Sequence, residues 1–395
     1  MRILFLHEVN YLTKPIFEMH EYPEHLSSKG HEVAFLHFPE GFSISEVKSL
    51  GWKTKINGRV LSLSKITLFT PQVSPGSSLG RAIHFLLGFF FISRAIREFA
   101  PDIVVSYAFP TFGLQGLYAS RRARVPYLSR VIDVSHKIRK FAAPGIIRFL
   151  ERRIYAGCDW LSANNCALLG YCCQMASRQI NFSVELPPLN ISHFSSQSSL
   201  NHKVKSALGI PIGSKVILYM GTFFYFSGLS EVIRSFSYAR KQNEYLVLVG
   251  GGEQDSELRQ LVRDLDLERV VIFTGYVTFE DLPKFLAIAT VAINPMLKST
   301  VSQFGFPNKV LQYMASAKPV SSTRLKSLES ILEESQSLLF GETPTEVLGN
   351  ALQLTRLDKA DLLGFENQKR ISEVFNLEIQ VRDFENLLQK VADLK

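Results

Sequence analysis

Short apolar segments alternate with helical patterns along most of this chain. The segments RILFL, EVAFLHF, DIVVSY and YLSRVI occur in the first half, and KVILYM, YLVLVG, VVIFTG and VAINP follow in the second. Runs that are apolar at nearly every position are typical of strands buried on both faces, and such strands belong to parallel sheets covered by helices. The alternation therefore predicts an α/β architecture of doubly wound sheets.

The alternation is interrupted at 185–203, where the chain reads ELPPLNISHFSSQSSLNHK. Prolines, a run of serines and the lack of periodicity predict a connection between two domains. A length of 395 residues also exceeds one usual domain. We expect a first domain at 1–190, a linker at 191–203, a second domain at 204–375 and an amphipathic C-terminal helix at 376–395.

The composition, with 46% hydrophobic and 20% charged residues, describes a globular protein. Its four cysteines lack the spacing of a metal site, so we expect buried thiols, a reducing cytoplasm and no metal; they are Cys158, Cys166, Cys172 and Cys173. The apolar run near the N-terminus is too short for a signal peptide.

Two features bear on a membrane surface. The run IHFLLGFFFIS at 83–93 is too short to span a bilayer, and it fits either a helix buried on a sheet or one that also presents aromatic side chains to a membrane. The segment 121–153 contains ten Lys or Arg and two acids. Such a basic segment favours anionic lipid or a phosphorylated acceptor. No nucleic-acid recognition motif accompanies it, so nucleic acid is not an expected partner.

The stretch FPNKVLQYMASAKPV at 306–320 predicts one short helix. Pro307 suits the first helical position, and Pro319 stops the helix. Helical spacing predicts an apolar face and a polar face free to meet a ligand. The apolar face has Val310, Leu311 and Met314, and the polar face has Lys309, Gln312 and Ser316.

Glycines follow three strands of the second domain, in MGTFFYFSGL, VGGGEQDSEL and TGYVTFEDL. In open α/β sheets, ligands bind beyond the carboxyl ends of the strands. Glycine lets the backbone approach a ligand closely, and backbone N–H groups can face negatively charged oxygen. These loops therefore favour a phosphate-bearing ligand.

The order of these motifs from 215 to 323, ending in FPNKVLQYMASAKPVSS, resembles the nucleotide-sugar half of retaining GT-B glycosyltransferases of the family 4 type, the glycosyl transferases group 1. The first half is similar in outline. The resemblance implies a GT-B fold of two facing Rossmann-like domains with a cleft between them. The first domain would hold the acceptor, the second would hold the donor, and the last helix would cross back to the first.

The resemblance also implies roles for particular residues. Donor-binding residues would be Gly221, Thr222, Gly250, Gly251, Lys298, Phe306, Pro307, Asn308, Lys309 and Gln312. Acceptor-binding residues would be His7, Glu8 and Asn10. Catalytic residues would be Asp133, His136 and Lys309, although a lone histidine such as His136 is also a common packing or surface residue. Lys309, Lys298 and the amides of Gly221 and Thr222 would meet the charge of the leaving phosphate.

The chain departs from the family pattern at several positions. Phe304 and Gln312 replace glutamates, and Thr222 and Ser227 stand where an arginine and a lysine are frequent. Two alternatives therefore stay open. One is an active, metal-independent, retaining hexosyltransferase that moves a sugar from an NDP-sugar to a saccharide, lipid-linked or small-molecule acceptor without a cofactor. The other is a catalytically degenerate binding or assembly subunit.

For either alternative we expect a cytoplasmic protein. The basic segment 121–153 adds the expectation that the protein binds peripherally to the inner face of the membrane. An epimerase on the same fold is disfavoured, because the acidic residues that it needs are not evident. An active enzyme of this type would serve polysaccharide or glycoconjugate biosynthesis.

Overall fold

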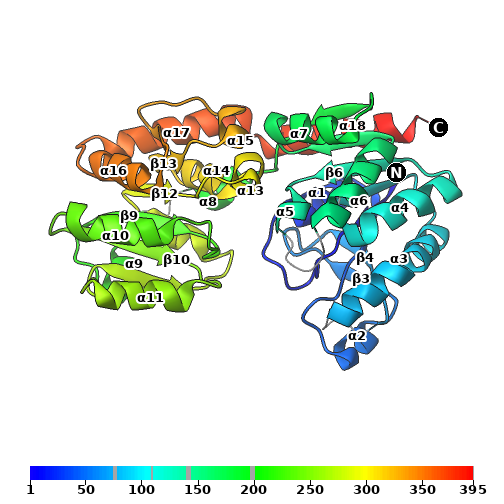
Figure 1. The fold of residues 1–395 in the computed structure, drawn as a ribbon, viewed down its shortest axis with the longest axis horizontal. Helices are drawn as coiled ribbons and strands as arrows, with labels where there is room; N and C mark the ends of the chain where they lie inside the picture. The colour runs from blue at the N-terminus through cyan, green and yellow to red at the C-terminus, as the bar shows by residue number, and fades with distance from the viewer. Residues whose placement is uncertain (74–77, 108–109, 139–143, 196–200, 395) are drawn as a thin grey trace. The chain divides into compact units, whose positions relative to one another are not determined.

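The computed structural model describes residues 1–73, 78–107, 110–138, 144–195 and 201–394. The chain divides into two compact units (Figure 1). The first unit contains Met1–Pro188 together with Glu378–Lys395, and the second contains Leu189–Leu377.

The first unit is built on an eight-stranded sheet in the order β3-β4-β2-β1-β5-β6-β7-β8. Neighbouring strands are parallel, except that β3 runs antiparallel to β4. The strands are β1 (Arg2–Leu6), β2 (Glu32–Leu36), β3 (Lys53–Asn57), β4 (Lys65–Phe69), β5 (Ile103–Tyr107), β6 (Tyr127–Val131), β7 (Trp160–Ala163) and β8 (Phe182–Val184). Central strands such as β1 and β5 are buried almost throughout, as expected for a sheet covered by helices.

The helices of the first unit include the last helix of the chain. They are α1 (Glu18–Ser28), α2 (Ile44–Leu50), α3 (Ser78–Phe99), α4 (Pro110–Ala123), α5 (Ser135–Ile138), α6 (Pro144–Gly157), α7 (Cys166–Ala176) and α18 (Leu377–Ala392). In α18, the Phe384 ring stacks on Tyr22 at a centroid distance of 4.2 Å. Glu385 of the same helix accepts from Lys29 at 2.7 Å. An aromatic pair and an ion pair thus join α18 to α1.

The apolar run predicted at 83–93 lies on α3. One side of this helix is buried, with Ile92 and Ala95 fully shielded. Leu86 and Phe90 lie on another side and are 71% and 67% exposed. Among the described residues, no helix is long and apolar enough to cross a membrane. α3 therefore packs on the unit while still presenting an apolar surface.

The second unit is built on a six-stranded parallel sheet in the order β11-β10-β9-β12-β13-β14. The strands are β9 (Lys215–Met220), β10 (Glu244–Val249), β11 (Val271–Gly275), β12 (Val291–Asn294), β13 (Val320–Thr323) and β14 (Leu338–Gly341). Ile217, Leu246 and Val291 on its central strands form part of one apolar core with α10 and α16.

The helices of the second unit cover this sheet. They are α8 (Ile191–Phe194), α9 (Asn201–Ala207), α10 (Leu229–Ala239), α11 (Asp255–Asp264), α12 (Leu282–Ala287), α13 (Thr300–Phe304), α14 (Asn308–Ala315), α15 (Lys326–Glu329), α16 (Pro344–Thr355) and α17 (Ala360–Val374). α10 shows the amphipathic pattern of such helices. Val232, Ile233 and Phe236 are buried against the sheet, and Glu231 lies on the polar side of the helix.

Some details differ from the sequence prediction. Pro307 is the N-cap of α14 rather than its first helical residue, because its ψ of 85° is not helical. Ser316 is only 2% exposed, so it does not extend the polar face of Lys309 and Gln312 to a ligand. Cys166 is exposed at the start of α7, whereas Cys158 and Cys172 are buried. Burial raises the pKa of Cys158 to about 12, so it is an inert thiol.

The segment predicted as a linker contains the short helix α8 and the first residues of α9. His193 of α8 stacks on Phe279 at a centroid distance of 4.2 Å, and its Nε2 lies 3.0 Å from the Phe279 carbonyl oxygen. This part of the segment therefore packs within the second unit.

Candidate functional site

The loops after β9 and β10 approach each other closely. Gly221 and Gly250 follow these strands with φ of 135° and 129°, a region that disfavours other residues. A Cβ atom on Gly250 would lie 2.1 Å from the Gly221 carbonyl oxygen, and one on Gly221 would lie 2.9 Å from Lys309 Nζ. Only glycine fits both positions. The backbone at this edge of the sheet is thus packed directly beside the Lys309 ammonium group.

Lys309 lies in the first turn of α14. Its Nζ donates to the Tyr219 hydroxyl at 2.9 Å and lies 4.2 Å from the centre of the Tyr219 ring. The Tyr219 hydroxyl in turn donates to the Thr222 carbonyl at 3.1 Å. Burial lowers the pKa of Lys309 to about 7. Among the described residues no carboxylate pairs with Lys309, so its charge is available to an anion.

The backbone amides of the glycine loops divide into two groups. The Gly221 and Gly250 amides donate to carbonyls at the ends of β10 and β11, at 2.9 and 3.0 Å. The Gly221 amide, which we expected to face the donor, is therefore used within the sheet. Within the described ranges, the amides of Thr222 and Gly251 donate to no acceptor. These N–H groups can therefore face a ligand.

The side of α14 next to Lys309 carries unsatisfied polar groups. The Asn308 Oδ1 atom is shielded from solvent and has no hydrogen-bond partner in the described part of the chain. The half-buried Gln312 side chain makes no hydrogen bond there either. Phe306 and Pro307 are buried before the helix. A buried oxygen without a partner is costly, so Asn308 and Gln312 are suited to bind the hydroxyls of a ligand.

Lys298 follows β12 and is exposed. It forms an ion pair with Glu342, which also accepts from Arg324 Nε at 3.0 Å. Lys298 thus belongs to an ion-pair network with Glu342 and Arg324, and Glu342 partly neutralises its charge. In the described part of the chain, Lys309 has no such carboxylate partner.

In the first unit, Asp133 lies just after β6. Burial raises its pKa to about 7, and the charge of Glu18 acts in the same direction. Glu18 accepts from Arg130 Nε at 2.6 Å, and Arg130 also donates to the Ser162 hydroxyl and the Glu185 carbonyl, each at 2.8 Å. Arg130, counted in the predicted basic segment, is therefore fully buried and does not contribute to a basic surface.

His136 is buried and held by two side chains. Its Nδ1 lies 2.6 Å from Glu151 Oε2, and its backbone N–H donates to Glu151 Oε1 at 3.1 Å. Its Nε2 lies 3.3 Å from the Tyr171 hydroxyl. The histidine is thus neither on the surface nor packed only against apolar groups. The Glu151 carboxylate thus fixes the orientation of the imidazole ring and directs Nε2 toward Tyr171.

The loop after β1 carries the expected acceptor residues, and all three are buried. The His7 ring stacks on Tyr107 at a centroid distance of 5.0 Å. The Glu8 carboxylate accepts from the Phe112 amide at 3.1 Å. The Asn10 side chain donates to the Glu40 carbonyl at 2.9 Å and accepts from the Leu12 amide at 3.1 Å. The Asn10 amide therefore stabilises the loop itself.

Both units resemble proteins of known structure, and the second also matches a known family. Residues 214–356 match the family model described as Glycosyl transferases group 1. HepE of Anabaena, solved with UDP and glucose, superposes with a TM-score of 0.76 at 18% identity, over 98% of this chain and 99% of HepE. Sucrose-phosphate synthase of Thermosynechococcus elongatus gives a TM-score of 0.79 at 15% identity, over 100% of both chains.

The chain has the fold of the GT-B glycosyltransferases, and its residues 214–356 are similar to the glycosyl transferases group 1. Curated relatives agree at lower coverage. The alpha-monoglucosyldiacylglycerol synthase of Streptococcus pneumoniae is 22% identical over 62% of this chain and 57% of the synthase. The lipopolysaccharide core biosynthesis glycosyltransferase LpsE of Rhizobium meliloti is 28% identical over 37% of this chain and 41% of LpsE. The matches thus span less than two thirds of the length of these relatives.

Three further residues of the candidate site could not be identified from the sequence. Tyr219 lies inside an apolar strand segment, where nothing distinguishes it from a core residue. Glu151 could have been noticed, since it is an acid in a helix that otherwise carries Arg148, Arg152 and Arg153. Tyr171 lies in an apolar helical pattern and gave no signal.

Proposed function

We propose that this protein transfers a sugar from a nucleoside-diphosphate sugar to a saccharide, lipid-linked or small-molecule acceptor, with retention of the anomeric configuration. The observation that carries the proposal is the Lys309 ammonium group, which lies over Tyr219 and beside Gly221 without a carboxylate partner among the described residues. The family match over 214–356 and the UDP bound to HepE support a nucleotide at this edge of the sheet.

The chemistry asks the protein mainly to stabilise the leaving diphosphate and to orient two substrates. Lys309 would bind the phosphate, and the amides of Thr222 and Gly251 would donate to its oxygens. Because the pKa of Lys309 is lowered to about 7, an arriving anion raises it and draws a proton onto the amine. In the proposal this charge serves the diphosphate without a metal ion. Asn308 and Gln312 would accept from ribose hydroxyls.

The acceptor side of the proposal rests on Asp133 and His136. A carboxyl with a pKa near 7 can exchange a proton with an acceptor hydroxyl at neutral pH. His136, oriented by Glu151, would bind the acceptor or the transferred sugar. His7 and Glu8 would line the same strand ends.

We also propose that the protein works in the cytoplasm at the inner face of a membrane, in polysaccharide or glycoconjugate biosynthesis. Support comes from α3, where Phe85, Leu86 and Phe90 are exposed. Exposed aromatic and aliphatic side chains on one helix fit insertion among lipid headgroups. Electrostatic attraction from exposed arginines of α4 and α6 would add to this binding.

The decisive experiment titrates the full chain with a panel of nucleoside diphosphates and NDP-sugars and then measures nucleotide release in the presence of acceptors. We expect tight binding of one nucleotide type, release that depends on an acceptor, and activity that persists with a metal chelator. The anomeric proton coupling of the product reports retention. Binding without any release would support the degenerate subunit, and no binding of any nucleotide would contradict the proposal.

A further inference from the structure

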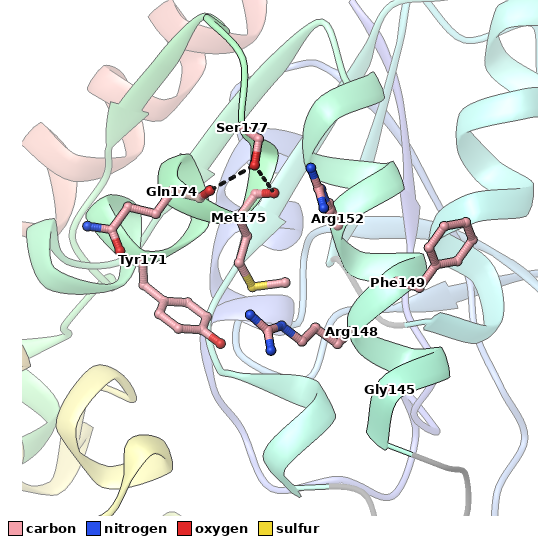
Figure 2. Close-up of a pocket in the computed structure, with 8 residues that line it drawn as sticks. All are labelled: Gly145, Arg148, Phe149, Arg152, Tyr171, Gln174, Met175 and Ser177. Carbon is pink, nitrogen blue, oxygen red and sulfur yellow. Dashed lines mark hydrogen bonds between the residues drawn. The ribbon is translucent and has the colours of Figure 1, made fainter.

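The first unit contains a second polar site that the proposed donor and acceptor residues do not use. A pocket of about 370 Å³ lies between α6 and α7 (Figure 2). From α6 it is lined by Arg148, Phe149 and Arg152, and from α7 by Tyr171, Gln174 and Met175. In Figure 2, Arg148 points from α6 toward Tyr171, and Arg152 lies one turn further along α6.

The two arginines of the pocket have no counter-charge among the described residues. Within the part of the chain that the structure describes, neither guanidinium group forms an ion pair or a hydrogen bond. They are four residues apart on one helix, a spacing at which like charges repel. This arrangement is unfavourable unless an anion binds between them.

The acid closest in sequence does not relieve this repulsion. Glu151 lies between the two arginines in the chain, but its side chain is buried and bound to His136. The carboxylate is therefore unavailable to Arg148 or Arg152. The wall opposite the arginines combines the buried Met175 with the polar side chains of Tyr171, Gln174 and Ser177. A ligand that fits the pocket directs an oxyanion toward the arginines.

We propose that this pocket binds the phosphate group of a phosphorylated acceptor. Planar guanidinium groups bind phosphate oxygens in pairs, and two of them on one helix face provide up to four parallel N–H donors. The inference rests on the proposed glycosyltransferase function, because it assigns the pocket to the acceptor.

The pocket adjoins the candidate catalytic residues of its own unit. The Tyr171 hydroxyl lies 3.3 Å from His136 Nε2, so one side chain forms the pocket wall and contacts the histidine. His136, in α5, follows Asp133 by three residues, and Asp133 lies just after β6. A phosphate held by Arg148 and Arg152 thus anchors the acceptor beside the groups that would meet its hydroxyl. The phosphate could belong to a soluble phosphorylated sugar or to a lipid headgroup, which share this chemistry.

The test uses calorimetric titration of the full chain with glycerol 1-phosphate, after saturation with UDP to occupy the donor site. We expect the double variant Arg148→Gln, Arg152→Gln to bind at least about tenfold more weakly, as loss of charge-assisted hydrogen bonds predicts. Arg153→Gln makes a similar charge change on the same helix outside the pocket and should bind like wild type. The double variant Arg148→Lys, Arg152→Lys keeps both positive charges and should keep part of the affinity. Such a result would show that the glutamine variant loses binding through lost charge and not through misfolding.

Vesicles of phosphatidylglycerol distinguish the two sources of phosphate. Vesicle binding that requires Arg148 and Arg152 and is displaced by glycerol 1-phosphate assigns the site to a lipid headgroup. Glycerol 1-phosphate binding without such vesicle binding assigns it to a soluble acceptor. The proposal is overturned if wild type does not bind glycerol 1-phosphate, or if the double variant binds it as tightly as wild type. A separate titration of the same variants with UDP tests the donor site alone. It therefore distinguishes failure of the donor-site proposal from failure of the pocket proposal.

Discussion

The Lys309 ammonium group lies 4.2 Å from the centre of the Tyr219 ring and donates to the Tyr219 hydroxyl at 2.9 Å. The ring and hydroxyl stabilise the cation without neutralising it, unlike the carboxylate of Glu342 at Lys298. The charge of Lys309 is thus available to a ligand, whereas the charge of Lys298 is already balanced. The structure therefore favours Lys309 over Lys298 as the residue that binds an anionic ligand, a choice that the sequence alone did not allow.

Lys309→Ala should weaken nucleoside-diphosphate binding about tenfold and reduce turnover about a hundredfold, because charge on the leaving phosphate grows toward the transition state. Calorimetry and steady-state kinetics measure the two effects. Lys298→Ala is the comparison variant, with a smaller effect on both, since Glu342 already balances its charge. Equal losses in the two variants would contradict the ranking.

Lys309→Met should make the protein more stable while it weakens donor binding. Burial lowers the pKa of Lys309 from 10.5 to about 7, so between these values the unfolded chain holds a proton that the folded chain has released. The free energy of unfolding of wild type should therefore rise with pH in this window and be lowest at or below pH 7. At neutral pH and below, the variant should gain about 1–3 kcal/mol.

Urea unfolding as a function of pH checks this prediction. The pH-dependent rise should disappear in Lys309→Met and persist in Lys298→Met, whose side chain is exposed. A variant that is less stable than wild type at pH 6 would show that the lysine is not under strain from burial.

Gly250→Ala should destabilise the second unit by about 3 kcal/mol, because its Cβ would meet the Gly221 carbonyl oxygen at 2.1 Å and the residue has a φ of 129°. Gly213→Ala is the matched control. Its φ is 90°, but its Cβ would meet no atom within 4 Å. It should cost only about 1 kcal/mol for the backbone conformation. Chemical denaturation of both variants separates steric overlap from backbone strain, and equal costs would refute the close approach.

Replacing Leu86 and Phe90 by serine should weaken binding to anionic vesicles about tenfold or more, because both side chains are exposed on α3. Sedimentation with vesicles at low and high salt measures the loss. Leu63→Ser removes a side chain that is 91% exposed elsewhere in the same unit and should leave binding unchanged. If wild type ignores anionic vesicles at low ionic strength, α3 does not dock on a membrane.

Much of the fold could be predicted from the sequence, because buried parallel strands leave a strong signal. The segment KVILYM became β9 (Lys215–Met220), and the glycines after it lie at the sheet edge where they were expected. Boundaries were harder to predict. α14 begins after Pro307, since that residue adopts a non-helical ψ that composition does not reveal.

The site was only partly predictable, for physical reasons. A lysine at the start of a helix suggests a phosphate ligand, but its partner Tyr219 is far away in sequence and looks like any core residue. Charge counting likewise misjudged 121–153, because Arg130 is buried against Glu18. Sequence gives the sign of a charge, whereas its availability depends on which distant side chain has already neutralised it.

The docking of α18 onto α1 has a consequence for synthesis of the chain. Most of the first unit is translated before the second unit, yet the Tyr22 ring receives Phe384 only after the whole second unit has been translated. The first unit therefore stays incomplete, with an apolar face uncovered, until α18 has been translated. The second unit can fold as soon as its own residues have been made. Nascent chains of this protein should be most prone to aggregate during that interval.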